Sequence, residues 1–149
     1  MRKPQHWGLV TTLREQFQGG CDQFLVTGSV AMLLYGLAYQ CDEPNDLDIT
    51  MINPTPETIR ILQALEAVNP LPNRPGYGSD ELFRFTMQGV QVDVFVEKEP
   101  VDALWYDWTQ INTPMRIIQA RAKLGRPKDI KSVCELAIRV AAQLSSIRK

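Results

Sequence analysis

Short hydrophobic segments separated by polar turns run along the whole chain and predict alternating helices and strands. Four apolar residues recur at the spacing of one helical face: Leu9, Val10, Leu13 and Phe17. They predict a first helix over about residues 7–18. Residues 23–27 then form a β-prone run that stops at Gly28, followed by an almost wholly apolar segment. This pattern predicts a strand, a tight turn and a buried helix capped by Ser29.

The middle of the chain predicts a second strand and a third helix. Residues 47–52 have the composition of a strand, and a polar stretch with two prolines follows them. Thr55 is a suitable N-cap and Pro56 suits the first helical turn. Apolar residues at helical spacing continue from there, so we expect a helix over about residues 56–68.

A hairpin and an irregular loop come next. Residues 82–87 and 90–96 alternate apolar and polar positions around a Gln-Gly pair, which is typical of a β-hairpin. Residues 69–80 hold three prolines and two glycines and are the best candidate for a loop over a site. A looser strand is expected near residues 109–112.

The end of the chain predicts a pair of helices. Apolar residues at helical spacing run from Pro114 to Leu124 and from Pro127 to Leu144, and Gly125 and Pro127 are typical helix punctuation. The expected fold is therefore α/β (α+β), with a small mixed sheet, flanking helices and a C-terminal helical pair. The length of 149 residues predicts one domain, with a core over about 22–113 and basic helices over about 114–149.

Composition narrows the protein class. Apolar residues make up 44% of the chain and charged residues 22%, which excludes disordered and collagen-like proteins. The longest apolar stretch is too short to span a bilayer and no signal pattern opens the chain, so we expect a cytoplasmic protein without membrane association. A single histidine and three widely spaced cysteines argue against histidine-based nucleophilic catalysis and structural zinc sites.

The net charge of −1 hides an asymmetry along the chain. Residues 1–113 contain 7 Lys and Arg against 15 Asp and Glu, whereas residues 114–149 contain 9 against 2. An acidic segment followed by a basic one indicates either two functional surfaces or one site that uses both signs.

Three aspartates on predicted strands are the most informative candidate residues. Asp46 and Asp48 are two positions apart, so their side chains point to one face of a strand, about 7 Å apart along it. Asp93 interrupts an otherwise apolar strand. If these strands are adjacent the three carboxylates converge, and two charges 5 Å apart repel by roughly 3 kcal/mol at an effective dielectric near 20. Such a cluster needs a cation, and Mg²⁺ prefers oxygen ligands together with substrate phosphates.

A Gly28-Ser29 turn between a strand and a helix is a second candidate, because glycine permits close approach and a helix start favours phosphate. Gly28-Ser29, Asp46-Leu47-Asp48 and Val92-Asp93-Val94 occur in the order that resembles the nucleotidyltransferase superfamily with the DNA polymerase beta fold. Gly28-Ser29-Val30-Ala31 with Tyr35-Gly36, and the stretch from Lys123 to Asp129, are similar to the AbiEii-like and related minimal nucleotidyltransferases of bacteria.

The resemblance implies a role for each matching residue. Asp46 and Asp48 would ligate the metals that hold a nucleoside triphosphate, and Asp93 would complete the site that activates the attacking hydroxyl. Gly28 and Ser29 would cradle the phosphates. The basic residues that would neutralise the triphosphate or the acceptor are Lys123, Arg126 and Lys128. The expected cofactor is Mg²⁺, as one or two ions, or Mn²⁺ in its place.

Several alternatives stay open. A catalytically silent binding or regulatory module, such as a toxin-antitoxin component, should have lost an acid, and none is missing. A two-metal nuclease usually has a lysine two residues after its second acid, whereas Val94 and Phe95 follow Asp93. A sequence-specific nucleic-acid binder is a further alternative, but the basic segment supports at most non-specific contacts with phosphate. The leading hypothesis is a Mg²⁺-dependent nucleotidyltransferase that transfers a nucleoside monophosphate to a hydroxyl on RNA, protein or a small molecule.

Overall fold

A mixed sheet with helices against it forms the body of the protein, as seen in a computed structural model that describes residues 6–36, 46–125 and 127–147. The helices are α1 (Trp7–Phe17), α2 (Gly28–Leu34), α3 (Pro56–Val68), α4 (Pro114–Leu124) and α5 (Pro127–Ile147), with a 3-10 turn η1 (Gln18–Gly20) after α1. The strands are β1 (Gln23–Thr27), β2 (Asp46–Ile52), β3 (Leu82–Met87), β4 (Val90–Glu97), β5 (Ala103–Tyr106) and β6 (Thr109–Asn112). The predicted fold class is confirmed.

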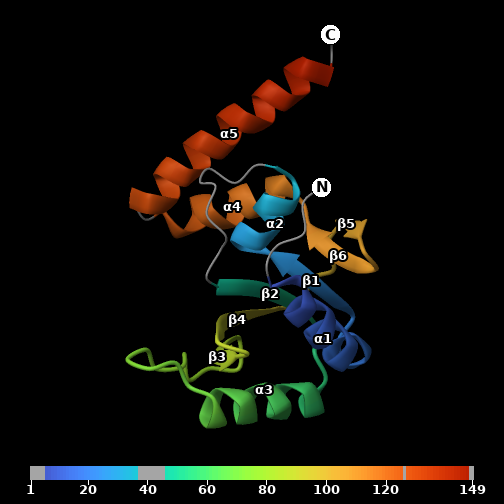
Figure 1. The fold of residues 1–149 in the computed structure, drawn as a ribbon, viewed down its shortest axis with the longest axis vertical. Helices are drawn as coiled ribbons and strands as arrows, with labels where there is room; N and C mark the ends of the chain where they lie inside the picture. The colour runs from blue at the N-terminus through green and yellow to red at the C-terminus, as the bar shows by residue number, and fades with distance from the viewer. Residues whose placement is uncertain (1–5, 37–45, 126, 148–149) are drawn as a thin grey trace.

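The strand order places the two acid-bearing strands side by side in the middle of the sheet. The order is β3-β4-β2-β1-β6-β5. β2 pairs with β4 in parallel and with β1 in antiparallel orientation, and β3 and β4 form the predicted hairpin. In Figure 1, α2 and α4 lie above β2, α3 lies at the bottom beside β3, and α5 extends away toward the C-terminus.

Side chains alternate between the two faces of the sheet, and one of these faces packs apolar residues into the core. Residues in register on four neighbouring strands bury one row of this apolar face: Phe83, Val94, Ile49 and Val26. Buried side chains of α1 and α3 belong to the same core. Because side chains alternate, the residues between these point to the opposite face, where all three aspartates lie.

The capping prediction for α2 is wrong. The helix begins at Gly28, so Thr27 and not Ser29 occupies the N-cap position, and its side chain makes no capping hydrogen bond. The reason is local: Gly28 has φ of +64°, which turns the chain directly from β1 into the helix. The Thr27 hydroxyl instead accepts a hydrogen bond from Asn112 Nδ2 at 3.1 Å.

The cap of α3 is confirmed and allows a stability prediction. Thr55 Oγ1 accepts a hydrogen bond from the Thr58 backbone N–H at 3.2 Å, with Pro56 in the first turn. We expect Thr55→Ala to lower the free energy of unfolding by about 1 kcal/mol, because the N–H loses its acceptor. Urea denaturation checks this, with Thr12→Ala on α1 as the control. Equal stability of the two variants would contradict the role of the cap.

Candidate active site

The three predicted aspartates lie together on one face of the sheet. Asp46 and Asp48 belong to β2, and Asp48 is directly opposite Asp93 on the parallel strand β4. One carboxylate oxygen from each of the three lies within 4.8 Å of the others. The convergence expected from the sequence is therefore present. Asp93 is buried, whereas Asp46 and Asp48 are half-buried and open toward solvent.

The donor set fits a hard divalent cation. Three carboxylates at this spacing repel one another unless positive charge is placed between or beside them. Oxygen-only ligands suit Mg²⁺ and Mn²⁺ better than softer metals. These residues could therefore hold one or two such ions, with remaining positions available to substrate oxygens.

Gly28 lies against one of the acids. A Cβ atom at this position would lie 2.2 Å from Asp48 Oδ2, closer than atoms can approach. The positive φ of Gly28 also belongs to a conformation that other residues rarely adopt. The backbone at Gly28 therefore borders the acid cluster, and the predicted contact of Gly28 and Ser29 with phosphate stays a prediction. Ser29 follows it and is exposed in the first turn of α2.

Of the three predicted basic residues, only Lys123 has a described side chain. Lys123 is exposed near the end of α4. Lys128 lies in the first turn of α5, but its side chain is outside the described part of the chain, and Arg126 lies wholly outside it. The proposed contact of these three residues with phosphate stays a prediction.

Two residues that were not predicted from the sequence as part of the site hold the carboxylate of Asp93. Arg84 Nε on β3 donates to Asp93 Oδ1 at 3.2 Å and forms an ion pair with it. Gln91 Nε2 donates to Asp93 Oδ2 at 3.1 Å. Each oxygen therefore has one donor and keeps lone pairs for a further ligand.

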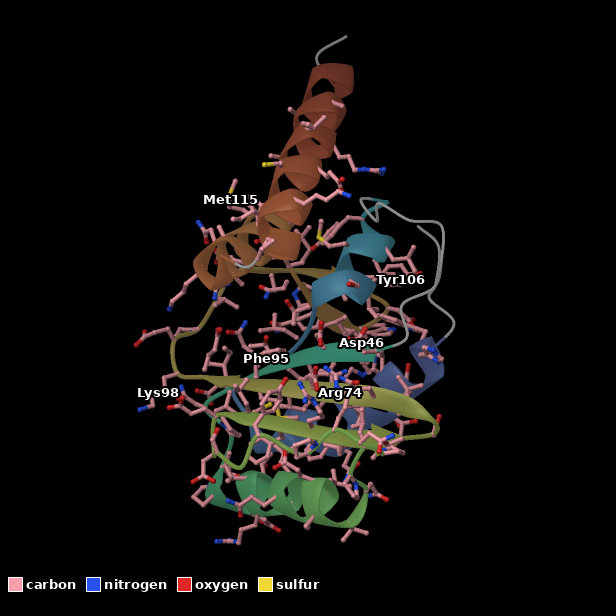
Figure 2. The ribbon with its side chains drawn as sticks, turned by 90° about the vertical axis from the view of Figure 1, so that its left-hand side faces the viewer. Asp46, Arg74, Phe95, Lys98, Tyr106 and Met115 are labelled. Atoms are coloured by element: carbon pink, nitrogen blue, oxygen red, sulfur yellow. The ribbon has the colours of Figure 1, made fainter. Side chains whose placement is uncertain are left out.

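The irregular loop over residues 69–80 contacts both Arg84 and Gln91, and is thereby linked indirectly to the Asp93 carboxylate. The Tyr77 ring lies over the Arg84 guanidinium, 4.2 Å from Cζ to the ring centroid, and the Tyr77 hydroxyl accepts a hydrogen bond from Arg84 Nη2. Arg74 Nη1 donates to Gln91 Oε1 at 3.0 Å. In Figure 2, Asp46 and Arg74 both lie away from Lys98, which follows the end of β4. The loop therefore contacts the two side chains that hold Asp93, and its role as a loop over the site stays a prediction.

Burial and neighbouring charges shift the pKa values of Tyr77 and Arg84. Burial, followed by the negative charge of Asp93, raises the pKa of the Tyr77 phenol above its ordinary value. Burial opposes the charge of Arg84, but Tyr77 and Asp93 outweigh it and raise the pKa of the guanidinium. At neutral pH the loop therefore presents a neutral phenol to a fully charged arginine.

The polar row continues across the sheet beyond the acids. Thr27 on β1 is directly opposite Asp48, and Asn112 on β6 donates to Thr27 Oγ1. Asn112 is buried and its Oδ1 has no partner among the described residues. Tyr35, at the end of α2, donates to the Asn112 carbonyl at 2.8 Å, and burial raises its pKa to about 12. This part of the face is polar but covered by α2.

The comparison with solved structures supports the fold. The chain is similar to a crystal structure from Thermotoga maritima that is named a "putative nucleotidyltransferase", with a TM-score of 0.56, 15% sequence identity and coverage of 93% of this chain and 96% of that chain. No protein-family model and no curated protein matches the sequence. Among the described residues, no helix combines the length and apolar character needed to cross a bilayer. The chain therefore has a nucleotidyltransferase-like fold with three acids clustered on its sheet.

Proposed function

We propose that this chain is a metal-dependent nucleotidyltransferase, which transfers a nucleoside monophosphate from a nucleoside triphosphate to a hydroxyl group of an acceptor. One observation carries the proposal: carboxylate oxygens of Asp46, Asp48 and Asp93 lie within 4.8 Å of one another on adjacent parallel strands. The similarity of the fold to the Thermotoga protein supports it.

Each acid has a proposed role. Asp46 and Asp48 would hold the ion that binds the triphosphate, and Asp93 would share in holding an ion near the acceptor hydroxyl. When bound, Mg²⁺ or Mn²⁺ would neutralise phosphate charge and favour loss of the hydroxyl proton. Gly28 borders the cluster, and Gly28 and Ser29 would lie against the phosphates.

The reaction needs little covalent chemistry from the protein. The acceptor oxygen forms a bond to the α-phosphorus, the bond from that phosphorus to the bridging oxygen breaks, and diphosphate leaves. Catalysis then depends on alignment and charge balance. The half-buried Asp46 and Asp48 are open to a charged substrate, while buried Asp93 is held in place by Arg84 and Gln91.

The presence of all three acids favours an enzyme over a silent regulatory module. A protein that only binds a partner has no need to bring three carboxylates together against their repulsion. The AbiEii-like relationship, a place in a toxin-antitoxin pair and a cytoplasmic location stay proposals from the sequence. RNA, a protein or a small molecule remain the acceptor classes to be tested.

Calorimetric titration of each nucleoside triphosphate, with and without Mg²⁺, tests this function directly. We expect binding that depends on the metal, and release of diphosphate, detected by phosphorus NMR, once a suitable acceptor is supplied. Binding of equal strength without Mg²⁺ would contradict the proposed site.

Lys128 provides a separate prediction for the basic segment. We expect Lys128→Ala to weaken triphosphate binding by about tenfold, the loss of one charged contact to phosphate. The fold should be unchanged, as judged by circular dichroism and thermal unfolding. Lys131→Ala, on the exposed part of the same helix, is the charge-matched control. If both variants bind like the parent, Lys128 is a solvated surface residue.

A further inference from the structure

Asp93, one of the three proposed metal ligands, also forms an ion pair with Arg84. The two side chains of this ion pair are only 15% and 10% exposed, and the Nε to Oδ1 distance is 3.2 Å. Shielding from water strengthens the interaction of the two charges and makes either one costly to leave alone. Asp93 therefore already has a cationic partner before any metal ion binds.

Arg84 is held in place independently of Asp93. Its backbone N–H donates to Glu66 Oε2 on α3 at 2.6 Å. Its guanidinium lies against the Tyr77 ring and donates to the Tyr77 hydroxyl. The pairing of β3 with β4 sets Arg84 directly opposite Asp93. A cation is thus built into the sheet beside the acid cluster.

The charge balance of the cluster depends on this arginine. Three carboxylates carry a formal charge of −3, and the guanidinium that is paired with Asp93 contributes +1 to this group of four side chains. A free divalent ion approaching Asp93 meets a carboxylate whose charge is already compensated. An ion that arrives with a triphosphate brings negative charge of its own, so the repulsion from Arg84 is offset.

We propose that Arg84 is a built-in counter-cation of the acid cluster, which stabilises Asp93 in the absence of metal and lowers the affinity of the cluster for free divalent ions. The proposal rests on the nucleotidyltransferase function above and adds its regulation: the site is filled when the ion and the triphosphate bind together. Arg84 is a positioning residue, because it acts through Asp93.

Mn²⁺ binding to the full chain without nucleotide tests the proposal, with electron paramagnetic resonance to measure free ion. We expect Arg84→Gln to bind Mn²⁺ about tenfold more tightly than the parent, because a nearby positive charge is removed. Arg84→Lys keeps the charge and should bind like the parent. Arg60→Gln makes the same charge change on the exposed face of α3 and should also bind like the parent.

Stability provides a second measurement that a simple packing role would not reproduce. Without metal, Arg84→Gln leaves a buried carboxylate unpaired, so its thermal unfolding temperature should fall and Mn²⁺ should raise it more than it raises that of the parent. The double variant Arg84→Gln with Asp93→Asn removes both charges and should recover most of the lost stability. A double variant as unstable as Arg84→Gln would overturn the charge role.

The outcomes separate this proposal from the proposed function. Unchanged or weaker Mn²⁺ binding by Arg84→Gln, with clear binding by the parent, overturns the counter-cation and leaves the metal site intact. Absence of Mn²⁺ binding in the parent and in every variant overturns the metal-dependent function together with the role of Arg84.

Discussion

Asp48→Asn should weaken Mg²⁺-dependent binding of a nucleoside triphosphate by about a hundredfold and reduce transfer by at least as much, since a metal ligand contributes several kcal/mol. Asparagine has nearly the same size but lacks the negative charge. Asp48 occupies the centre of the site: it lies opposite Asp93 and its Oδ2 lies beside Gly28. Calorimetry with and without Mg²⁺ measures the effect.

Stability separates loss of the site from loss of the fold in this experiment. Removing one of three clustered carboxylates relieves repulsion, so Asp48→Asn should unfold at the same temperature as the parent or slightly above it. Asp102→Asn removes an exposed charge in the segment before β5 and should bind nucleotide like the parent. Parent-like, Mg²⁺-dependent binding by Asp48→Asn would remove the basis for the proposed function.

The sequence predicts those parts of the fold whose patterns are local. Strands β1 and β2 follow from short β-prone segments, and helix α3 follows from helical periodicity with a clear N-cap. Edge strand β5 is missed because Leu104 and Trp105, neighbours along it, are both exposed, so the strand lacks the alternation of a half-buried one. The Ser29 cap is wrong because the left-handed conformation of Gly28 cannot be read from residue type.

The acid cluster is predictable because strand alternation places Asp46 and Asp48 on one face, and only the adjacency of β2 and β4 has to come from the structure. The contact between Arg84 and Asp93 can also be predicted from the sequence. A two-residue turn after Met87 pairs it with Val90, and counting back along the predicted hairpin pairs Arg84 with Asp93.

Contacts from the loop could not be predicted in this way. Tyr77 and Arg74 belong to an irregular segment, and no periodicity relates them to Arg84 or Gln91. Their positions depend on tertiary packing, including the contact of Gly76 with Glu66 of α3. The proposed ligands and the pairing of Arg84 with Asp93 can therefore be predicted from the sequence, whereas the loop contacts that Tyr77 and Arg74 make require the structure.

Gly28→Ala should damage both stability and the metal site. Alanine at φ of +64° costs about 1 to 2 kcal/mol in this conformation, and its Cβ would meet Asp48 Oδ2 at 2.2 Å. Relieving that overlap lowers the stability by about a further 1 to 3 kcal/mol and displaces the Asp48 carboxylate. Because a shift of about 1 Å can cost a hundredfold in rate, transfer should fall by about that factor.

Gly89→Ala is the matched control, since it separates backbone strain from contact with the acid. Gly89 also has a positive φ, +76°, but no atom of the described residues lies within 4 Å of a Cβ built there. Gly89→Ala should therefore lose only the stability that alanine costs at a positive φ. It should bind Mn²⁺ like the parent. Urea denaturation and Mn²⁺ titration of both variants make the comparison. If both lose the same stability and keep the same Mn²⁺ affinity, Gly28 is needed only for the turn, and its closeness to Asp48 has no role in the site.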